Sequence, residues 1–136
     1  MPHLSTVGVH LSKSKRFSTS DAFKGFWQIP ITGNIESQSM LTPLGIFTPM
    51  RLPQENLNSV FAFQRSMDSI FRRTLTIGQL LIWVDDLLAH APDDETLLAL
   101  LRKIFELCRL CGLKLNATRC SFYCILKLVF LLTLIV

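Results

Sequence analysis

The stretch Leu80–His90 reads Leu-Leu-Ile-Trp-Val-Asp-Asp-Leu-Leu-Ala-His and places two adjacent carboxylates between two short apolar runs. A buried strand normally excludes charge, because removing an unpaired carboxylate from water is very costly. The stretch therefore predicts a hairpin that turns at Asp85-Asp86 and presents both carboxylates at its tip. Aspartate is also a common turn residue, so two interpretations stay open at this point, a surface turn and a metal site.

The composition places the chain among single-domain proteins with one hydrophobic core. It has 136 residues, of which 49% are hydrophobic, and the mean hydropathy of +0.38 is high for a soluble domain. A net charge of +4 is compatible with a polyanionic partner but does not require one. Residues 1–16 contain no apolar run of the signal-peptide type, so we expect an intracellular protein.

Three elements are predicted upstream of the paired carboxylates. Arg16–Ala22 is typical of a short strand that ends on a further carboxylate, Asp21. A hairpin is predicted around Pro43-Leu44-Gly45, where glycine suits a positive φ. Asn58 is the expected N-cap of a helix, whose apolar face is indicated by residues that recur every three or four positions: Val60, Phe63, Met67, Ile70 and Phe71.

The clearest helix pattern is Asp93–Cys111, which has acidic residues in its first turn and Gly112 just past its end. Strand, hairpin, helix, strand-turn-strand and helix follow one another along the chain. This order predicts an α+β fold in which an antiparallel sheet has helices packed on one face.

The C-terminal third has two further features, four spaced cysteines and an apolar end. Cysteines at C-x2-C and C-x3-C spacing suggest a zinc ribbon, but the first pair falls inside the predicted helix, which favours cysteine as a small buried hydrophobe. The stretch Ser121–Val136 is almost wholly apolar, and its unbroken run after Lys127 has nine residues. Since a spanning helix needs roughly 20 residues, we expect a buried last strand or a non-native reading frame there. The cysteines are Cys108, Cys111, Cys120 and Cys124.

The predicted elements can bring three carboxylates to one edge of a sheet. Asp21 ends one strand, and Asp85 and Asp86 lie at a hairpin tip. Phosphoryl transfer uses carboxylates in this way to hold two Mg²⁺ ions about 3.5–4 Å apart. Mg²⁺ prefers hard oxygen ligands and shares them with substrate phosphates, so few protein carboxylates suffice.

Seven short motifs then carry a resemblance through their order and spacing. They are Phe17–Asp21, Gly25–Pro30, Thr42–Gly45, Arg51–Gln54, Phe63–Arg65, Trp83–Asp86 and Gly112–Asn116. Over about residues 2–123 the set resembles the reverse-transcriptase palm of gypsy-like long-terminal-repeat retrotransposons. The resemblance implies a palm fragment at residues 1–123 with a remnant of the fingers and no thumb, followed by an apolar tail at residues 124–136.

The resemblance also implies roles for individual residues. Asp21 and Asp85 would be metal ligands for two Mg²⁺ (or Mn²⁺) ions, with Asp86 beside them as a catalytic or structural carboxylate. Phe26 falls where the family keeps an aromatic steric gate against a 2′-hydroxyl, with core packing as the alternative. Gln54 matches a residue that contacts the incoming nucleotide.

Phosphate contacts are implied for three basic residues, Arg65, Lys114 and Arg119, and such contacts are sensitive to salt. A solvated surface role is the alternative for each. Arg119 stands where the family often carries a lysine, and a guanidinium is a poor general acid because it does not readily give up its proton. Glu55 replaces a glycine that lets the backbone approach the nucleotide closely, and Trp83 replaces a Tyr or Phe.

Taken together, the resemblance implies an RNA-directed DNA polymerase domain, a nucleotidyltransferase of a retrotransposon. Its partners would be an RNA or DNA template-primer and dNTP, and its activity would be impaired by truncation. A non-catalytic relic or a domesticated nucleic-acid-binding module is the alternative. No stable membrane association is expected, and the oligomeric state is not predicted.

Overall fold

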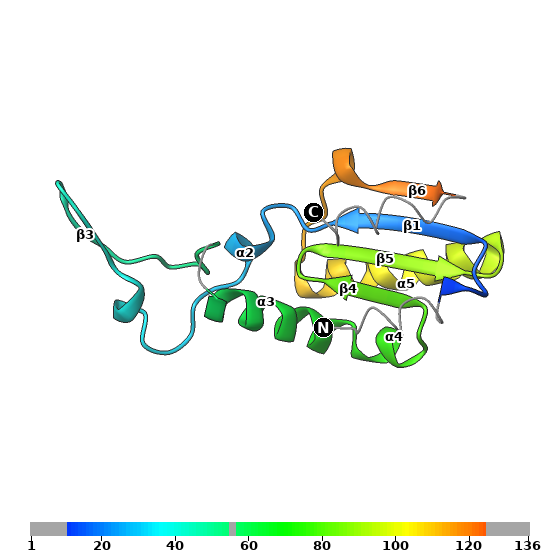
Figure 1. Cartoon of the computed structure of the whole chain (residues 1–136), viewed down its shortest axis with the longest axis horizontal. Coiled ribbons are helices and arrows are strands. Elements are labelled where there is room, and N and C mark those ends of the chain that lie inside the picture. Colours follow the sequence, from blue (N-terminus) through cyan, green and yellow to red (C-terminus); the bar gives the residue numbers. More distant parts are fainter. Residues whose placement is uncertain (1–10, 55–56, 125–136) are drawn as a thin grey trace.

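The computed structural model describes residues 11–54 and 57–124, and its centre is a four-stranded antiparallel sheet. The strands lie in the order β4-β5-β1-β6, so the first strand pairs with two strands that come much later in the chain (Figure 1). The four strands are β1 Arg16–Asp21, β4 Leu80–Trp83, β5 Asp86–Ala91 and β6 Ser121–Cys124. The strand predicted to end on Asp21 is confirmed as β1.

Three helices cover one face of this sheet, as predicted. They are α3 (Leu57–Ile70), α4 (Arg72–Thr76) and α5 (Asp94–Cys111), and α5 contacts β5 and β1 while α3 contacts β4. Alternate strand residues face these helices because successive side chains of a strand point to opposite faces. The resulting core contains, among others, Phe63, Met67, Leu80, Ile82, Leu87, Leu97 and Ile104.

The opposite face of the sheet has a second, smaller apolar cluster. Phe17 of β1 and Leu88 of β5 are only 3% and 2% exposed there, and they pack with Leu11 and Leu81. Both faces of the sheet are therefore apolar at their centre, and strongly polar side chains are confined to the ends of the strands.

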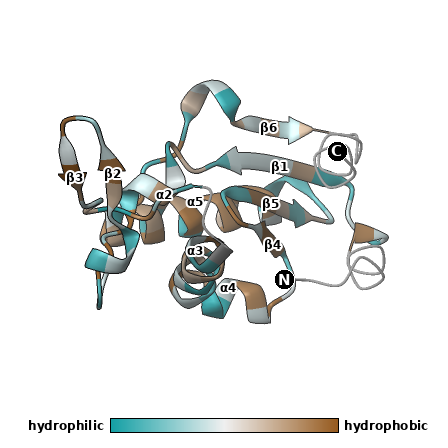
Figure 2. Cartoon of the chain, turned by 60° about the vertical axis from the view of Figure 1, so that its left-hand side comes forward, coloured by the Kyte–Doolittle hydropathy of each residue, from teal (hydrophilic) through white to brown (hydrophobic). Residues whose placement is uncertain are grey.

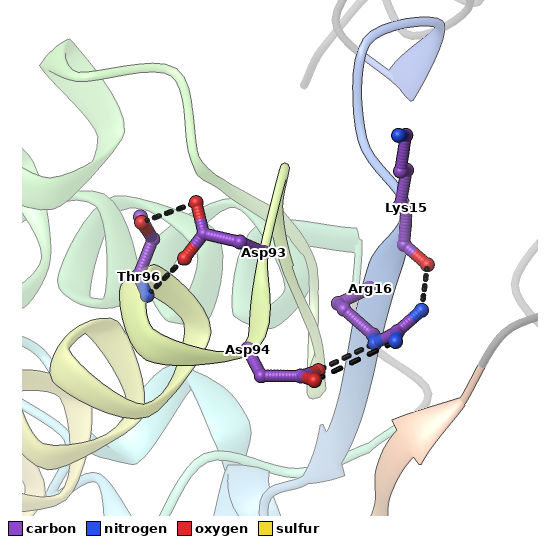
Figure 3. Close-up of polar contacts among 5 residues, drawn as sticks. All are labelled: Lys15, Arg16, Asp93, Asp94 and Thr96. Carbon is purple, nitrogen blue, oxygen red and sulfur yellow. Dashed lines mark hydrogen bonds and ion pairs between the residues drawn. The ribbon is translucent and has the colours of Figure 1, made fainter.

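The predicted helix over residues 93–111 is confirmed as α5, but it begins one residue later, and Asp93, which was predicted in the first turn, is its N-cap (Figure 3). The Asp93 carboxylate accepts hydrogen bonds from the Thr96 amide (2.7 Å) and hydroxyl (2.9 Å). These bonds lower the pKa of Asp93. Gly112 closes the helix in the left-handed conformation, with φ of 74°. An ion pair between Arg16 and Asp94 joins the start of β1 to the start of α5.

The N-cap predicted for the preceding helix is wrong. Helix α3 begins at Leu57, so Asn58 lies in its first turn instead of before it.

A two-stranded hairpin projects from the body of the molecule (Figure 1). It consists of β2 (Met40–Thr42) and β3 (Gly45–Phe47), which confirms the predicted hairpin, and Gly45 has the expected positive φ of 129°. A 3₁₀ turn at Glu36–Gln38 and the short helix α2 (Gly25–Gln28) precede it in the chain. The hairpin is apolar yet exposed (Figure 2), since Leu41 and Leu44 keep 85% and 91% of their surface.

The C-terminal features predicted from the sequence are placed in part. Cys108 lies in α5 and packs in the main core, as expected for a small buried hydrophobe, and burial raises the pKa of its thiol to about 11. Cys111 follows it on the exposed side of the same helix. The tail from residue 125 lies outside the described residues. Within the described part of the chain, no helix has the length and apolar character that a membrane span requires.

We expect Gly25→Ala to destabilise the protein by about 1–3 kcal/mol through overpacking. A Cβ at this position would lie 2.8 Å from Cζ of Phe63, a fully buried ring. Urea denaturation of the full chain measures the loss. In a Phe63→Leu background the same substitution should cost distinctly less, and an equal cost in both backgrounds would contradict this packing argument.

Candidate active site

The pairing of β1 with β5 brings the three predicted carboxylates to one end of the sheet. Asp21, the last residue of β1, is the direct cross-strand partner of Asp86, the first residue of β5. One residue further on, the Ala22 amide donates a hydrogen bond to the Asp85 carbonyl oxygen at 2.8 Å. Residues far apart in the sequence thus share one end of the sheet, as the sequence predicted.

The tip of the hairpin lies one residue earlier than predicted. The turn is formed by Val84 and Asp85, whereas Asp86 already belongs to β5. The reason is that Asp86 pairs with Trp83 on one side and with Asp21 on the other, which extends the strand. Val84 has a φ of 54°, a left-handed conformation that is unfavourable for a β-branched residue.

A buried glutamine holds this strained turn. Gln64 of α3 is 6% exposed and accepts a hydrogen bond from the Val84 amide at 2.8 Å. Its amide nitrogen donates to the Asp68 carboxylate at 2.9 Å and lies 3.4 Å from the Ile82 carbonyl oxygen. Because the side chain satisfies backbone groups on the hairpin, the helix fixes where the carboxylates lie.

The segment that follows α5 also contacts Asp21. The Asn116 amide donates to the Asp21 carbonyl oxygen at 2.8 Å, and Asn116 Nδ2 lies 3.3 Å from Asp21 Oδ2. Arg119 Nη1 lies 3.9 Å from the same Oδ2. The guanidinium is mostly exposed, so we assign this long ion pair little energy.

A second glutamine joins helix α2 to that same segment. Gln28 Nε2 donates to the carbonyl oxygens of Phe23 (2.6 Å) and Lys114 (2.9 Å), and Gln28 Oε1 accepts from the Lys114 amide (2.7 Å). Arg51 in turn donates to the Gln28 carbonyl oxygen at 3.0 Å. This bridge holds α2 beside the strand end that carries Asp21.

These contacts enclose an open cleft of about 310 Å³. The structure brings five of the predicted site residues to it, namely Asp21, Asp85, Phe26, Gln54 and Arg119. The other lining residues are Ala22, Phe23, Lys24, Gly25 and Asn116.

Three predicted residues lie outside this lining. Asp86 stands one strand position away, and Lys114 is joined to the site through its backbone. Arg65 is exposed on α3 and does not reach the cleft. The segment 55–56, which includes Glu55, lies outside the described residues.

Phe26 combines the two interpretations that the sequence left open. Its ring stacks on Phe63 with centroids 5.0 Å apart and an interplanar angle of 28°, and it packs against the main core. The same residue lines the cleft. Core packing therefore fixes the ring where it can limit what enters.

The cleft is electrostatically unfavourable for carboxylates. Burial raises the pKa of Asp86 to about 6, with smaller increases from the negative charges of Asp85 and Asp21. Burial also raises the pKa of Asp85, and Asp21 adds to this increase. Arg119 opposes both shifts. Since neighbouring carboxylates disfavour one another's charge, the site gains from a cation.

The side chains fit a divalent metal through their donor atoms. Carboxylate oxygens are ligands of the type that Mg²⁺ prefers, and the two predicted ligands, Asp21 and Asp85, both line the cleft. Within residues 11–54 and 57–124, no group of three His, Cys, Asp or Glu side chains is close enough to hold a metal as it stands. The arrangement is thus a two-carboxylate site with Asp86 alongside.

Sequence reasoning missed Gln28, Gln64 and Asn116, which hold the carboxylates in place. Each is an uncharged polar residue next to apolar residues of its motif, and a polar residue in such a place often serves a hydrogen bond to the backbone. That signal was present in the sequence, but the partners that join these residues to other elements of the site lie 18 to 95 residues away along the chain.

Comparison with known proteins supports the family resemblance that the motifs indicate. A family model described as "Reverse transcriptase (RNA-dependent DNA polymerase)" matches residues 2–132. The Pol polyprotein from transposon 412 of Drosophila melanogaster is 30% identical over 124 residues, which are 90% of this chain and 10% of that protein. The Pol polyprotein from transposon 297 of the same organism is 28% identical over 123 residues, 90% of this chain and 12% of that protein.

A solved structure agrees on the fold. The foamy viral protease-reverse transcriptase in complex with an RNA/DNA hybrid superposes with a TM-score of 0.74 and 24% identity, covering 88% of this chain and 16% of that one. The chain therefore has the palm fold expected from its motifs. It spans about a tenth of the length of the two transposon polyproteins.

We expect Gln64→Leu to lower the free energy of unfolding by about 1–3 kcal/mol, because it leaves the Val84 amide without its buried acceptor. Chemical denaturation measures this loss. Arg65→Leu is a matched control from the exposed side of the same helix, and it should change stability by less than about 0.5 kcal/mol. An equal loss in both variants would contradict the proposed role of Gln64.

Stability in EDTA should fall as the pH rises from about 4 to about 6. The folded pKa of Asp86 exceeds its unfolded value of 3.8, so the folded state binds the extra proton in this window. The penalty is complete above about pH 6. We expect about 1–2 kcal/mol, allowing for solvent screening of a half-buried group.

Urea denaturation at several pH values checks this dependence against two variants. Asp86→Asn should reduce the fall to the part that Asp85 contributes, whereas Glu106→Gln, an exposed residue of α5, should retain it in full. An undiminished fall in Asp86→Asn would assign it to other groups.

Proposed function

Since the chain belongs to the reverse transcriptase (RNA-dependent DNA polymerase) family, we propose that it is the palm part of a retrotransposon RNA-directed DNA polymerase. The reaction transfers a nucleotide from dNTP to a primer 3′-hydroxyl and releases pyrophosphate. The observation that supports it most is the convergence of Asp21 with Asp85 and Asp86, which come from separate elements, at one end of the sheet.

The family uses divalent metal ions, and we infer two Mg²⁺ (or Mn²⁺) ions at this site. Asp21 and Asp85 would hold them, and Asp86 would add negative charge from the neighbouring strand position. Metal ions so bound activate the attacking hydroxyl and stabilise the leaving oxygen. The raised pKa values of Asp85 and Asp86 support this assignment, because the carboxylates are held together where a cation would relieve their repulsion.

Two uncharged residues of the cleft lining suit a deoxynucleotide. Phe26 is held by Phe63, so its ring could occupy the space of a 2′-hydroxyl and favour dNTP over rNTP. Gln54 is exposed at the same cleft and could donate a hydrogen bond to the nucleotide. We expect Phe26→Ala to relax sugar discrimination more than it weakens dNTP binding.

An RNA or DNA template-primer is the proposed macromolecular partner. Arg119 lines the cleft, and Lys114 lies next to it, so both could meet phosphates of a strand entering the site. Arg65 lies on the exposed side of α3 and would contact only a strand that extends past the cleft. A guanidinium keeps its proton at neutral pH, so we assign Arg119 a role in binding charge and none in proton transfer.

Calorimetric titration of the full chain with Mn²⁺ tests the metal site directly. We expect binding that Asp85→Asn weakens about tenfold or more, because it removes one of two charged ligands. Glu106→Gln, an exposed residue on α5, should leave the affinity unchanged. Absence of binding, or binding that Asp85→Asn leaves unaltered, would overturn the proposed site.

Primer extension on poly(A)/oligo(dT) tests the reaction. We expect little or no incorporation by this chain by itself, because affinity for template-primer comes mostly from many phosphate contacts and the cleft offers few.

A non-catalytic nucleic-acid-binding module is the second candidate, and Arg119 favours it. Its guanidinium lies 3.9 Å from the Asp21 carboxylate, where a positive charge relieves carboxylate repulsion without a metal ion. Salt-dependent RNA binding that is unaffected by Asp85→Asn, together with no Mn²⁺ binding, would support this candidate over the polymerase.

A further inference from the structure

An exposed group of two aromatic rings and one lysine, which the proposed function has not used, lies at the start of helix α2, where Lys24 is the N-cap. Phe23 and Trp27 are 43% and 53% exposed, and the Lys24 amine lies 5.5 Å and 5.4 Å from the centres of their rings. We name these three residues the aromatic–lysine cluster. Both distances are within the range of a cation–π interaction.

The cluster stands on a rigid base. On the inner side of α2, Gly25 leaves no room for a Cβ against the Phe63 ring, and Phe26 stacks on that ring. At the end of the helix, Gln28 is bonded to both backbone polar groups of Lys114. The exposed rings therefore project from a segment whose backbone is fixed on two sides.

Within residues 11–54 and 57–124, no carboxylate forms an ion pair with Lys24. Among the described residues the ion pairs are Arg16 with Asp94 and Arg119 with Asp21, and Lys24 takes part in neither. Its ammonium is held by the quadrupoles of two rings, which limit its motion without cancelling its charge. A lysine held in this way remains available to an anion.

Lys24 also lines the same cleft as Asp21, Asp85 and Gln54. A ligand that carries phosphates and is bound through divalent metal on the carboxylates would extend along this wall, because such metals share substrate phosphate oxygens. Lys24 and Arg119, which come from separate segments of the chain, are the two basic residues of the cleft lining. The cleft thus offers a second positive group, besides Arg119, that can stabilise negative charge.

We propose that Lys24, held by Phe23 and Trp27, binds the triphosphate of the incoming nucleotide. The proposal rests on the proposed function for its substrate, but it concerns residues that no part of the metal site requires. The rings reduce the freedom that the lysine side chain loses on binding, which is how pre-organisation increases affinity. Lys24 and the cluster are specificity elements for a polyphosphate.

Binding of inorganic tripolyphosphate to the full chain, without divalent metal, tests the proposal. The readout is Trp27 fluorescence in a Trp83→Phe background, which leaves Trp27 as the single tryptophan. An anion bound at this ammonium lies close to the Trp27 ring and changes that emission. We expect Lys24→Gln to raise the dissociation constant about tenfold, the size of one lost charge-assisted contact.

Two variants complete this experiment. Lys13→Gln removes an exposed lysine that precedes the start of β1, whereas the cleft lies at the other end of this strand. This variant should leave the dissociation constant unchanged. Phe23→Leu keeps the lysine and the fluorophore but removes one ring, and it should raise the constant about threefold. A Lys24→Gln effect below twofold, or one equal to that of Lys13→Gln, overturns the proposal.

A second ligand separates the triphosphate from the phosphates of a strand. Affinity for a ten-residue oligothymidylate should change less than twofold in Lys24→Gln, and a loss as large as that for tripolyphosphate would overturn the triphosphate assignment. Loss of tripolyphosphate binding in Lys24→Gln supports the anion site even if Asp85→Asn leaves Mn²⁺ binding unaltered, in which case the polymerase proposal fails. The reverse pair of results overturns only the inference about Lys24.

Discussion

The antiparallel pairing of β1 with β5 is the constraint on which the rest of the structure depends. It joins Asp21 to Asp86 across a long stretch of chain, and it sets which strand residues face the helices. Closing so long a loop costs entropy, and the apolar side chains on both faces of the sheet offset this cost. The position of the carboxylates is thus a consequence of packing.

The side-chain amides of two glutamines fix the site relative to the packed helices. Gln64 reaches from α3 to the turn and gives the Val84 amide an acceptor, and Gln28 ties α2 to the segment before Asn116. Both side chains satisfy backbone groups that regular strands and helices leave open. A strained turn with a β-branched residue at positive φ persists because the surroundings hold it.

The cleft combines opposite charges in separate places. Asp21 and Asp85 lie at the end of the sheet, Arg119 follows α5, and Lys24 caps the start of α2 beside two exposed rings. A substrate made of a metal-bound polyphosphate and a sugar matches that arrangement better than a simple anion or cation would. Phe26 adds a shape limit, because its ring is fixed by the core behind it.

By itself, the sequence determined the α+β order, the long helix that ends before Gly112, and the carboxylates of the site, because these depend on local pattern and motif spacing. Only the tertiary structure decided the position of the turn and the residues that hold it. Cross-strand pairing includes Asp86 in β5, so the tip is Val84–Asp85 instead of the predicted Asp85-Asp86. Gln64 of α3 accepts a hydrogen bond from the Val84 amide of this turn. Local pattern cannot specify strand register or a side chain's distant partner, since both depend on which surfaces the core brings together.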